Sequence, residues 1–122
     1  MAQWKVHRLE DQPREQMIAG VKRRFVSGER TTVGQIWLAK DALVPEHTHE
    51  SEQVSYIIEG SMRFTLGGKD VVTVNAGEIL VIPSMLPHSA EALEDTYDLD
   101  LFAPRREDWI SGNDAYLRGR GR

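Results

Sequence analysis

Two histidines separated by a single residue constrain the fold of this chain more than any other feature. His47 and His49 flank Thr48, and alternate side chains of a β-strand point to the same side, so both imidazoles would face one point. Imidazole is largely neutral near pH 7, so such a pair can hold a transition metal without first losing protons. His88 follows an apolar run at 79–82 and a turn at 83–87. The sequence therefore predicts a β-structure in which a later strand adds a third histidine.

A glutamine is the next candidate ligand. Gln53, Ser55 and Ile57 alternate along the following strand, and the amide oxygen of Gln53 can bind a metal. Because glutamine is neutral, a divalent ion held by it and three imidazoles would keep its full charge, which favours a Lewis acid. Non-haem iron oxygenases more often include a carboxylate, although iron sites made of histidines alone weaken that argument. The alternative is a hydrogen-bonded glutamine at the rim.

Short apolar runs and frequent turn residues indicate an all-β fold in a single domain. The predicted strands are 22–26, 32–40, 46–49, 53–59, 61–66, 70–74, 78–82, 88–92 and 96–102. Gly67 and Gly68 predict a hairpin turn, because glycine reaches the positive φ values that two-residue hairpins need. Only residues 105–113 read as a short helical turn. We assign 1–20 to an N-terminal extension or strand, 21–104 to the barrel and 105–122 to a C-terminal turn and basic tail.

Composition narrows the classes of function. The 122 residues contain no cysteine, which excludes disulfides and thiolate ligands, so any site depends on histidine, amide and carboxylate groups. The net charge of −4, with mixed signs, argues against a nucleic-acid partner. Arginine and glycine alternate over 118–122, where we expect a solvated tail rather than a phosphate site. Neither a secretory signal nor a membrane-spanning run is evident, so we expect a cytoplasmic protein.

The last predicted strand carries a second group of polar residues. Leu99 and Leu101 alternate with Asp98, Asp100 and Phe102, so the two sets lie on opposite faces. On an edge strand the leucines would enter the core and the aspartates would face water. In a barrel covered by a second subunit, the aspartates could instead face the lumen. A buried carboxylate costs several kcal/mol, so Asp100 would then need the metal, an arginine such as Arg63 or Arg106, or a raised pKa.

The spacing resembles the two motifs of the cupin superfamily, whose fold is a double-stranded β-helix, or jelly-roll barrel. His47, His49, Gln53 and Gly60 match the first motif, and Gly77, Pro83 and His88 match the second. Most cupins carry glutamate where this chain has Gln53. Asp41 and Met85 stand where the family usually has glycine, and Ala92 where it usually has asparagine. These departures fall on turn and support positions and leave the ligand assignment intact.

The closing segment resembles a narrower group. Asp100, Phe102, Pro104, Arg106 and Asp108 form an Asp-x-Phe-x-Pro-x-Arg-x-Asp pattern, similar to the KdgF-like pectin-degradation cupins. Those enzymes convert 4,5-unsaturated uronates, the products of pectate and alginate lyases, into linear keto sugars. The resemblance implies one divalent transition metal ion, which could be nickel, zinc, manganese, iron or copper, held by His47, His49, Gln53 and His88. It also implies that Asp100, Phe102 and Arg106 contribute to activity.

These residue types suit that chemistry. Arg106 could grip a sugar carboxylate through two parallel hydrogen bonds, Asp100 could move a proton, and Phe102 could form an apolar wall. Two other classes of function stay open: a metal-dependent dioxygenase or another cupin isomerase, and a sugar- or ligand-binding cupin without catalysis.

A homodimer is the expected assembly. The apolar outward face of the last strand, together with Trp4, Trp37 and Trp109, predicts a surface that a second subunit covers. The expected partners are a small sugar acid and this second subunit, without nucleic acid or membrane.

Overall fold

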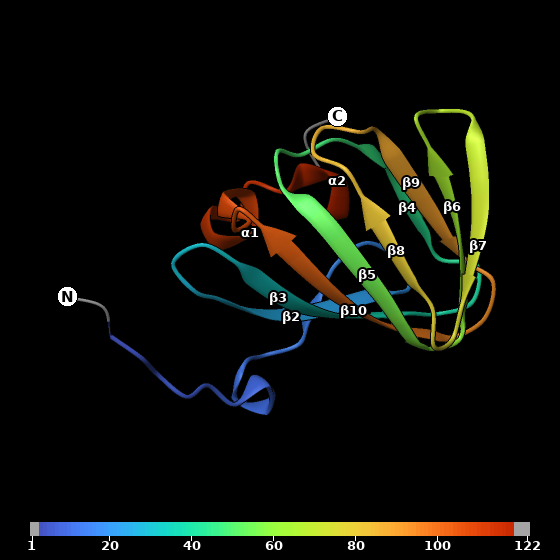
Figure 1. The fold of residues 1–122 in the computed structure, drawn as a ribbon. Coiled ribbons are helices and arrows are strands. Elements are labelled where there is room, and N and C mark those ends of the chain that lie inside the picture. The colour runs from blue at the N-terminus through green and yellow to red at the C-terminus, as the bar shows by residue number, and fades with distance from the viewer. Residues whose placement is uncertain (1–2, 119–122) are drawn as a thin grey trace.

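The computed structural model describes residues 3–118, whose strands form two antiparallel sheets that face each other (Figure 1). The six-stranded sheet has the order β1-β2-β3-β10-β5-β8. Its strands are β1 (Glu15–Gln16), β2 (Val21–Ser27), β3 (Thr32–Leu38), β5 (Glu52–Glu59), β8 (Ile79–Ile82) and β10 (Thr96–Ala103). The four-stranded sheet, β4-β9-β6-β7, contains β4 (Leu43–His47), β6 (Ser61–Leu66), β7 (Asp70–Asn75) and β9 (His88–Ala92). This is the predicted all-β jelly roll.

The core lies between the sheets because alternate residues of the inner strands point inward. Thr32, Gly34, Ile36 and Leu38 of β3 are buried, and the residues between them are only partly so. Met62 and Phe64 of β6 meet this layer from the opposite sheet. The same alternation runs through β10, so one face of the closing strand belongs to the lumen.

Glycines fix the turns that the sequence predicts. Gly67 and Gly68 have φ of 63° and 76°, positive values that glycine adopts readily, and the Lys69 N–H donates to the Leu66 carbonyl across the turn at 3.2 Å. Gly60 joins β5 to β6 with φ of 93°. A Cβ at Gly60 would lie 2.4 Å from the carbonyl oxygen of Asp95, so this motif position excludes a side chain.

The C-terminal segment differs from the prediction. The expected helical turn is present as α1 (Glu107–Ser111), which ends at Gly112 in the left-handed conformation. A second helix, α2 (Ala115–Arg118), follows. The predicted solvated tail is therefore wrong for Arg118, because its guanidinium pairs with Asp114 and Glu15. Residues 119–122 of that tail lie outside the described residues.

The ion pairs of Arg118 belong to a larger network. Asp114 also accepts a hydrogen bond of 2.5 Å from the fully buried Arg23, and Arg23 donates to Glu15 at 3.0 Å. The network ties the segment before α2 to β1 and β2. Carboxylates and guanidinium groups that share partners in this way satisfy each other's charge away from water.

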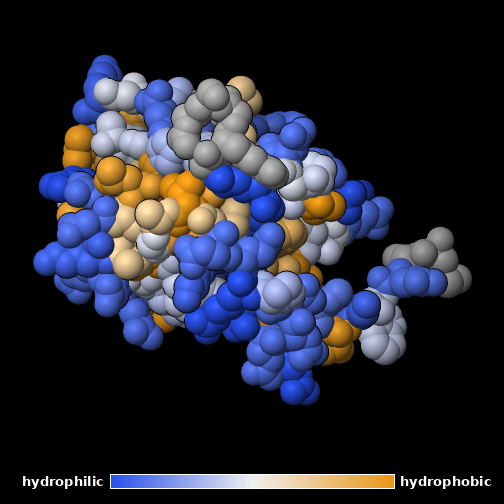
Figure 2. Space-filling model, turned by 180° about the vertical axis from the view of Figure 1, so that it is seen from behind, coloured by the Kyte–Doolittle hydropathy of each residue, from blue (hydrophilic) through white to orange (hydrophobic). Residues whose placement is uncertain are grey.

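The exposed surface carries apolar side chains in several places. Figure 2 shows one such area, framed by polar residues, on the side seen from behind. On the outer face of the six-stranded sheet, Tyr56, Ile79, Val81 and Leu101 are exposed.

Trp109 is only 3% exposed, so the expectation that a second subunit covers it is wrong: α1 turns the indole into the barrel. In residues 3–118, no helix is apolar and long enough to cross a membrane.

Two departures from the cupin motifs coincide with backbone strain. Asp41 and Met85 have φ of 73° and 67°, and they are the non-glycine residues with positive φ among the described residues. Side chains disfavour this conformation by roughly 1–2 kcal/mol, although aspartate tolerates it better than methionine. The chain thus keeps the turns that the family usually builds with glycine.

Met85→Gly should therefore stabilise the protein by about 0.5–1 kcal/mol, because relief of the strained φ outweighs the extra chain entropy of glycine. Met85 is 57% exposed, so little packing is lost. Urea unfolding followed by circular dichroism measures the change. Asp41→Gly should give a smaller gain. A Met85→Gly variant less stable than the wild type would contradict the strain argument.

Candidate metal centre and lumen

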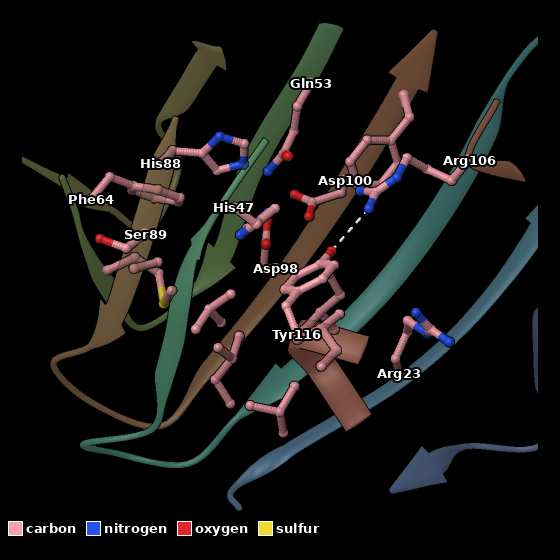
Figure 3. Close-up of a pocket in the computed structure, with 18 of the residues that line it drawn as sticks. Arg23, His47, Gln53, Phe64, His88, Ser89, Asp98, Asp100, Arg106 and Tyr116 are labelled. Carbon is pink, nitrogen blue, oxygen red and sulfur yellow. Dashed lines mark hydrogen bonds between the residues drawn. The ribbon is translucent and has the colours of Figure 1, made fainter. Parts of the chain in front are cut away.

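Three histidines converge on one side of the lumen, and Figure 3 shows two of them, His47 and His88. β4 ends at His47, which pairs directly with His88 of β9. The predicted strand 46–49 is wrong in its bounds, because β4 spans Leu43–His47 and ladder pairing stops at His47 after an irregularity. His49 lies in the turn before β5. Its ring still lies 4.9 Å from that of His88 and 5.5 Å from that of His47, between centroids.

The backbone fixes the orientation of each ring. Nδ1 of His47, His49 and His88 lies 2.8 Å, 2.9 Å and 2.9 Å from the carbonyl oxygens of Pro45, Ser51 and Leu86, respectively. An Nδ1–H that donates to a carbonyl leaves the Nε2 lone pair free, and this is the usual support of a metal-binding histidine. All three rings are thus held in the tautomer that a metal needs.

Burial keeps the three rings neutral. It lowers the pKa of His47 to about 3, with help from the neighbouring His88, and lowers that of His49 to about 4, with help from Arg106. Burial also lowers the pKa of His88. Near neutral pH a metal would therefore meet unprotonated nitrogens and displace no proton.

Gln53 completes the set of candidate ligands. Its Oε1 lies 3.0 Å from Nε2 of His49, and its Nε2 donates to Oγ of Ser55 at 2.8 Å. With His49 protonated at Nδ1, two lone pairs would face each other across this 3.0 Å gap. A cation between them removes the repulsion, as would a reversed amide. Nε2 of His88 is buried without a hydrogen-bond partner among the described residues, which a metal would also satisfy.

Distances agree with this interpretation. Nitrogens from the three imidazoles lie within 4.8 Å of one another. Two nitrogens that bind one ion at about 2.1 Å each can be at most about 4.2 Å apart, so binding would draw the rings slightly together. The donor set fits a divalent transition metal, which these residues would hold through three imidazoles and one amide oxygen.

The aspartates of β10 face the lumen. Asp98 and Asp100 are 5% and 3% exposed, whereas Leu101 is 44% exposed, so the alternative with leucines in the core is wrong. Burial, followed by the charge of Asp100, raises the pKa of Asp98 well above its ordinary value. Burial also raises the pKa of Asp100, although hydrogen bonds from Asp98 and Ser55 and the charge of Arg106 oppose it. Oδ1 of each aspartate is buried without a partner among the described residues.

Arg106 enters the same cavity from beyond the end of β10. Its Nε and Nη2 donate to the two carboxylate oxygens of Asp108 at 2.9 Å and 2.7 Å, and Nη2 also donates to the Tyr116 hydroxyl at 2.9 Å. Nη1 takes part in none of these bonds. Arg63, the other arginine considered for Asp100, instead pairs with Glu91 at the surface.

Aromatic rings form the apolar wall. Phe102 is 2% exposed and lies edge-on to His49 and Trp109, at 5.7 Å and 4.9 Å between centroids. Trp109 fits because β3 has Gly34 opposite Asp100, where a Cβ would lie 2.9 Å from the indole. Phe102 therefore lines the lumen, and its role as a wall for the sugar stays a prediction.

Sequence reasoning missed three residues that line the lumen: Arg23, Trp109 and Tyr116. The alternation in β10 already placed Asp98 on the same face as Asp100, and the closing pattern already contained Asp108. No comparable signal exists for Tyr116, because α2 brings it to the lumen through tertiary contacts alone.

A jelly roll with histidines of two sequence motifs gathered in its lumen is the architecture of the cupins. Residues 37–103 match the Cupin domain family, and the chain belongs to that family. Its structure is similar to that of KdgF from Halomonas sp., with a TM-score of 0.79 and 25% identity over 88% of this chain and 99% of that one.

Other proteins similar to this chain are named for different activities. A cupin from Shewanella frigidimarina NCIMB 400, described as RmlC-like, has a TM-score of 0.76 and 29% identity, covering 82% of this chain and 90% of that one. A variant of Bacillus subtilis oxalate decarboxylase has a TM-score of 0.72 and 25% identity, covering 79% of this chain but 28% of the enzyme. Acireductone dioxygenase of Yarrowia lipolytica is 36% identical over 56 residues, which are 43% of this chain and 32% of that protein. The chain thus spans about a third of this curated relative.

Replacing His88 by alanine should weaken metal binding by about 100-fold or more, because loss of a ligand costs at least as much as loss of a supporting hydrogen bond. Titration calorimetry with nickel and zinc measures the affinity. His7→Ala is the matched control, since His7 is exposed near the N-terminus and its loss should leave the affinity unchanged. Equal weakening by both substitutions would contradict the proposed site.

Asp98→Asn should stabilise the metal-free protein at neutral pH by about 1–3 kcal/mol, because the neutral amide avoids the cost of keeping a titratable carboxyl group buried at a pH above its ordinary pKa. The native pKa is raised above the ordinary 3.8, so the wild type loses stability as the pH rises from that value through the native pKa. The variant's advantage should thus be smallest near pH 4 and should grow as the pH rises towards the native pKa.

Urea unfolding at several pH values gives this profile. Asp70→Asn, a change at an exposed aspartate, serves as the control and should be nearly neutral. A destabilised Asp98→Asn variant at neutral pH would mean that the Asp98 carboxylate has a stabilising partner.

Proposed function

We propose that this cupin is a metal-dependent enzyme that converts 4,5-unsaturated uronates into linear keto uronates. The observation that carries the proposal is that His47, His88, Asp100 and Arg106 line one cavity. A metal site, a protonatable acid and a carboxylate-binding group thus come together out of water. The structural similarity to KdgF supports the same reading.

Arg106 would bind the substrate carboxylate. Asp108 holds the Nε side of the guanidinium in a bidentate pair. This leaves Nη1 and the N–H of Nη2 that now donates to the Tyr116 hydroxyl as the groups that a ligand carboxylate would take. Guanidinium and carboxylate groups form two parallel hydrogen bonds in this geometry. Because Asp108 fixes the Arg106 guanidinium, the arginine side chain loses little conformational entropy when the sugar binds.

Asp100 would move the proton. Opening of the sugar hemiacetal breaks the bond between C1 and the ring oxygen and leaves an enol. The enol becomes a ketone when C4 gains a proton and the enol oxygen loses one, so the net reaction is an isomerisation. A bound divalent metal would supply Lewis-acid stabilisation of negative charge on the sugar oxygens. A carboxyl group whose pKa burial has raised can hold a proton for delivery to carbon, and Phe102 would orient the sugar against it.

A dioxygenase is the second candidate, because the chain also matches part of acireductone dioxygenase. Oxygen consumption by the iron-loaded protein would favour it. A binding protein without catalysis is the third, and tight sugar-acid binding without product would favour that. A cytoplasmic location and a source of the sugar in pectin or alginate stay predictions.

A homodimer through the outer face of the six-stranded sheet is part of the proposal. Tyr56 pairs with Ile79, and Val54 lies between Val81 and Leu101, across β8, β5 and β10. Four of these five side chains are exposed apolar groups. Apolar neighbours on one open sheet face favour a self-complementary interface.

Asp100→Asn should abolish turnover of 4,5-unsaturated galacturonate or mannuronate while metal content stays unchanged, because the amide cannot carry the proton. The assay follows the loss of absorbance of the conjugated double bond in metal-loaded protein against spontaneous decay. Arg106→Ala should lose metal-dependent acceleration by about 100-fold or more, since a charge-assisted carboxylate clamp is missing.

Asp70→Asn and Arg63→Ala provide matched controls at the surface and should retain activity. If Asp100→Asn also loses the metal, then Asp100 is a ligand or a structural residue. If the wild type accelerates the conversion of neither substrate with any of the candidate metals, the uronate proposal is wrong, and a dioxygenase or a non-catalytic binding protein is favoured instead.

Light scattering on a sizing column should give the mass of a dimer for the wild type. Val81→Glu should give a monomer, because it places a charge within the apolar face. Val71→Glu, at an exposed valine of the other sheet, is the control and should remain dimeric. A wild-type monomer in dilute solution would rule out this assembly.

A further inference from the structure

The lumen is too small for the ligand that its residues suit. The cavity between the histidines, the aspartates and Arg106 has a volume of about 50 Å³, whereas pockets for small ligands are usually about 300–1,000 Å³. A six-carbon sugar acid cannot enter it as it stands. Part of the wall must therefore move when such a ligand binds.

The part of the wall that fills the space beside Arg106 belongs to α2. The ring of Tyr116 stacks on His47 at 4.0 Å between centroids with an angle of 18°. Its hydroxyl accepts hydrogen bonds from Nη2 of Arg106 at 2.9 Å and from the Trp109 indole at 3.4 Å. Leu117 of the same helix is 4% exposed and lines the cavity. Figure 3 shows Tyr116 reaching across the lumen to Arg106.

The Arg106 side chain would keep its position if a ligand replaced its contact with Tyr116. Asp108 alone keeps two bonds to the guanidinium, so Arg106 stays in place when the phenol leaves. A phenol is a neutral acceptor, and a carboxylate that accepts from the same Nη2 is charged and forms the stronger bond. An acidic ligand thus has a direct advantage over Tyr116 for this position.

The attachment of α2 permits such movement. Asp114, before the helix, is anchored on the buried Arg23 and also pairs with Arg118 of the helix itself. The pair that ties the far end of α2 to another element joins Arg118 to Glu15, whose side chains are 25% and 33% exposed. An ion pair at this exposure contributes little to stability. The helix is a single turn, so it can leave the lumen while Asp114 stays.

We propose that Tyr116 is a substrate-facing residue that sets access to the lumen. Its hydroxyl holds the position on Arg106 that a substrate carboxylate oxygen takes, and α2 swings out when an acidic sugar binds. The identity of the ligand as a uronate rests on the proposed function, whereas the exchange of phenol for carboxylate does not depend on turnover.

The test uses galacturonate, which carries the carboxylate but lacks the double bond and cannot react. Titration calorimetry compares its binding to the metal-loaded wild type, Tyr116→Phe and Tyr56→Phe. Tyr116→Phe keeps the ring on His47 and removes only the competing hydroxyl, so it should bind galacturonate about tenfold more tightly. Tyr56→Phe, a matched change at a tyrosine on the outer face of the six-stranded sheet and outside the lumen lining, keeps the apolar ring of the proposed dimer face and should bind like the wild type.

Two further measurements distinguish competition between the ligand carboxylate and the Tyr116 hydroxyl from a general increase in the mobility of α2. Galactose, which has no carboxylate, should gain no affinity from Tyr116→Phe. Hydrogen exchange of residues 115–118 should become faster when galacturonate saturates the wild type, because α2 leaves the lumen. Galacturonate binding that is weakened by Tyr116→Phe, or that protects residues 115–118 from exchange, would overturn the proposal, as would an absence of galacturonate binding to all three proteins.

The outcomes for the two proposals can be told apart. Tighter galacturonate binding by Tyr116→Phe, combined with no turnover of unsaturated uronates, supports the exchange and refutes the proposed reaction. Turnover by the wild type, with a KM that Tyr116→Phe leaves unchanged, supports the reaction and refutes the exchange.

Discussion

The cost of holding ionisable groups out of water governs the lumen of this barrel. Each such group must lose its charge or find a partner there. The three histidines stay neutral because burial lowers their pKa values. Burial raises the pKa values of Asp98 and Asp100. Arg106 keeps its charge and is paired with Asp108. One physical constraint thus yields nitrogen lone pairs, carboxyl groups with raised pKa values and a fixed cation in a single cavity.

The arrangement of these groups depends on the two-sheet architecture. His47 and His88 come from the four-stranded sheet, whereas Gln53 and Asp100 come from adjacent strands of the six-stranded sheet. Packed sheets lie about 10 Å apart, so inward side chains from both sides meet near the middle. β10 lies between β3 and β5, and this central position is what turns its aspartates inward. On an edge strand the same sequence could have exposed them.

Much of this could be predicted from the sequence because the relevant signals are local. The two-residue alternation placed Gln53, Ser55 and Ile57 on one buried face, and the glycine pair placed the hairpin between β6 and β7. Signals that depend on tertiary contacts failed. Trp109 was expected at a subunit interface, but its indole packs inside the barrel against Gly34, where a Cβ would leave no room for it. Arg118 was expected in a solvated tail, but Asp114 and Glu15 hold it. Alternation alone also could not decide which face of β10 is buried.

The cupin motifs and the closing segment carry different kinds of information. The fixed glycines of the motifs stand where the backbone adopts a positive φ: Gly60 and Gly77 have φ of 93° and 88°. Asp41 and Met85 adopt the same left-handed region without being glycine, so the turn geometry that spaces the histidines is kept even where the usual residue is not. The motifs therefore specify a scaffold and a metal site, which many activities share. The Asp100–Asp108 segment instead supplies an acid, an apolar wall and a braced cation, and the choice between isomerase, dioxygenase and binding protein depends on those groups.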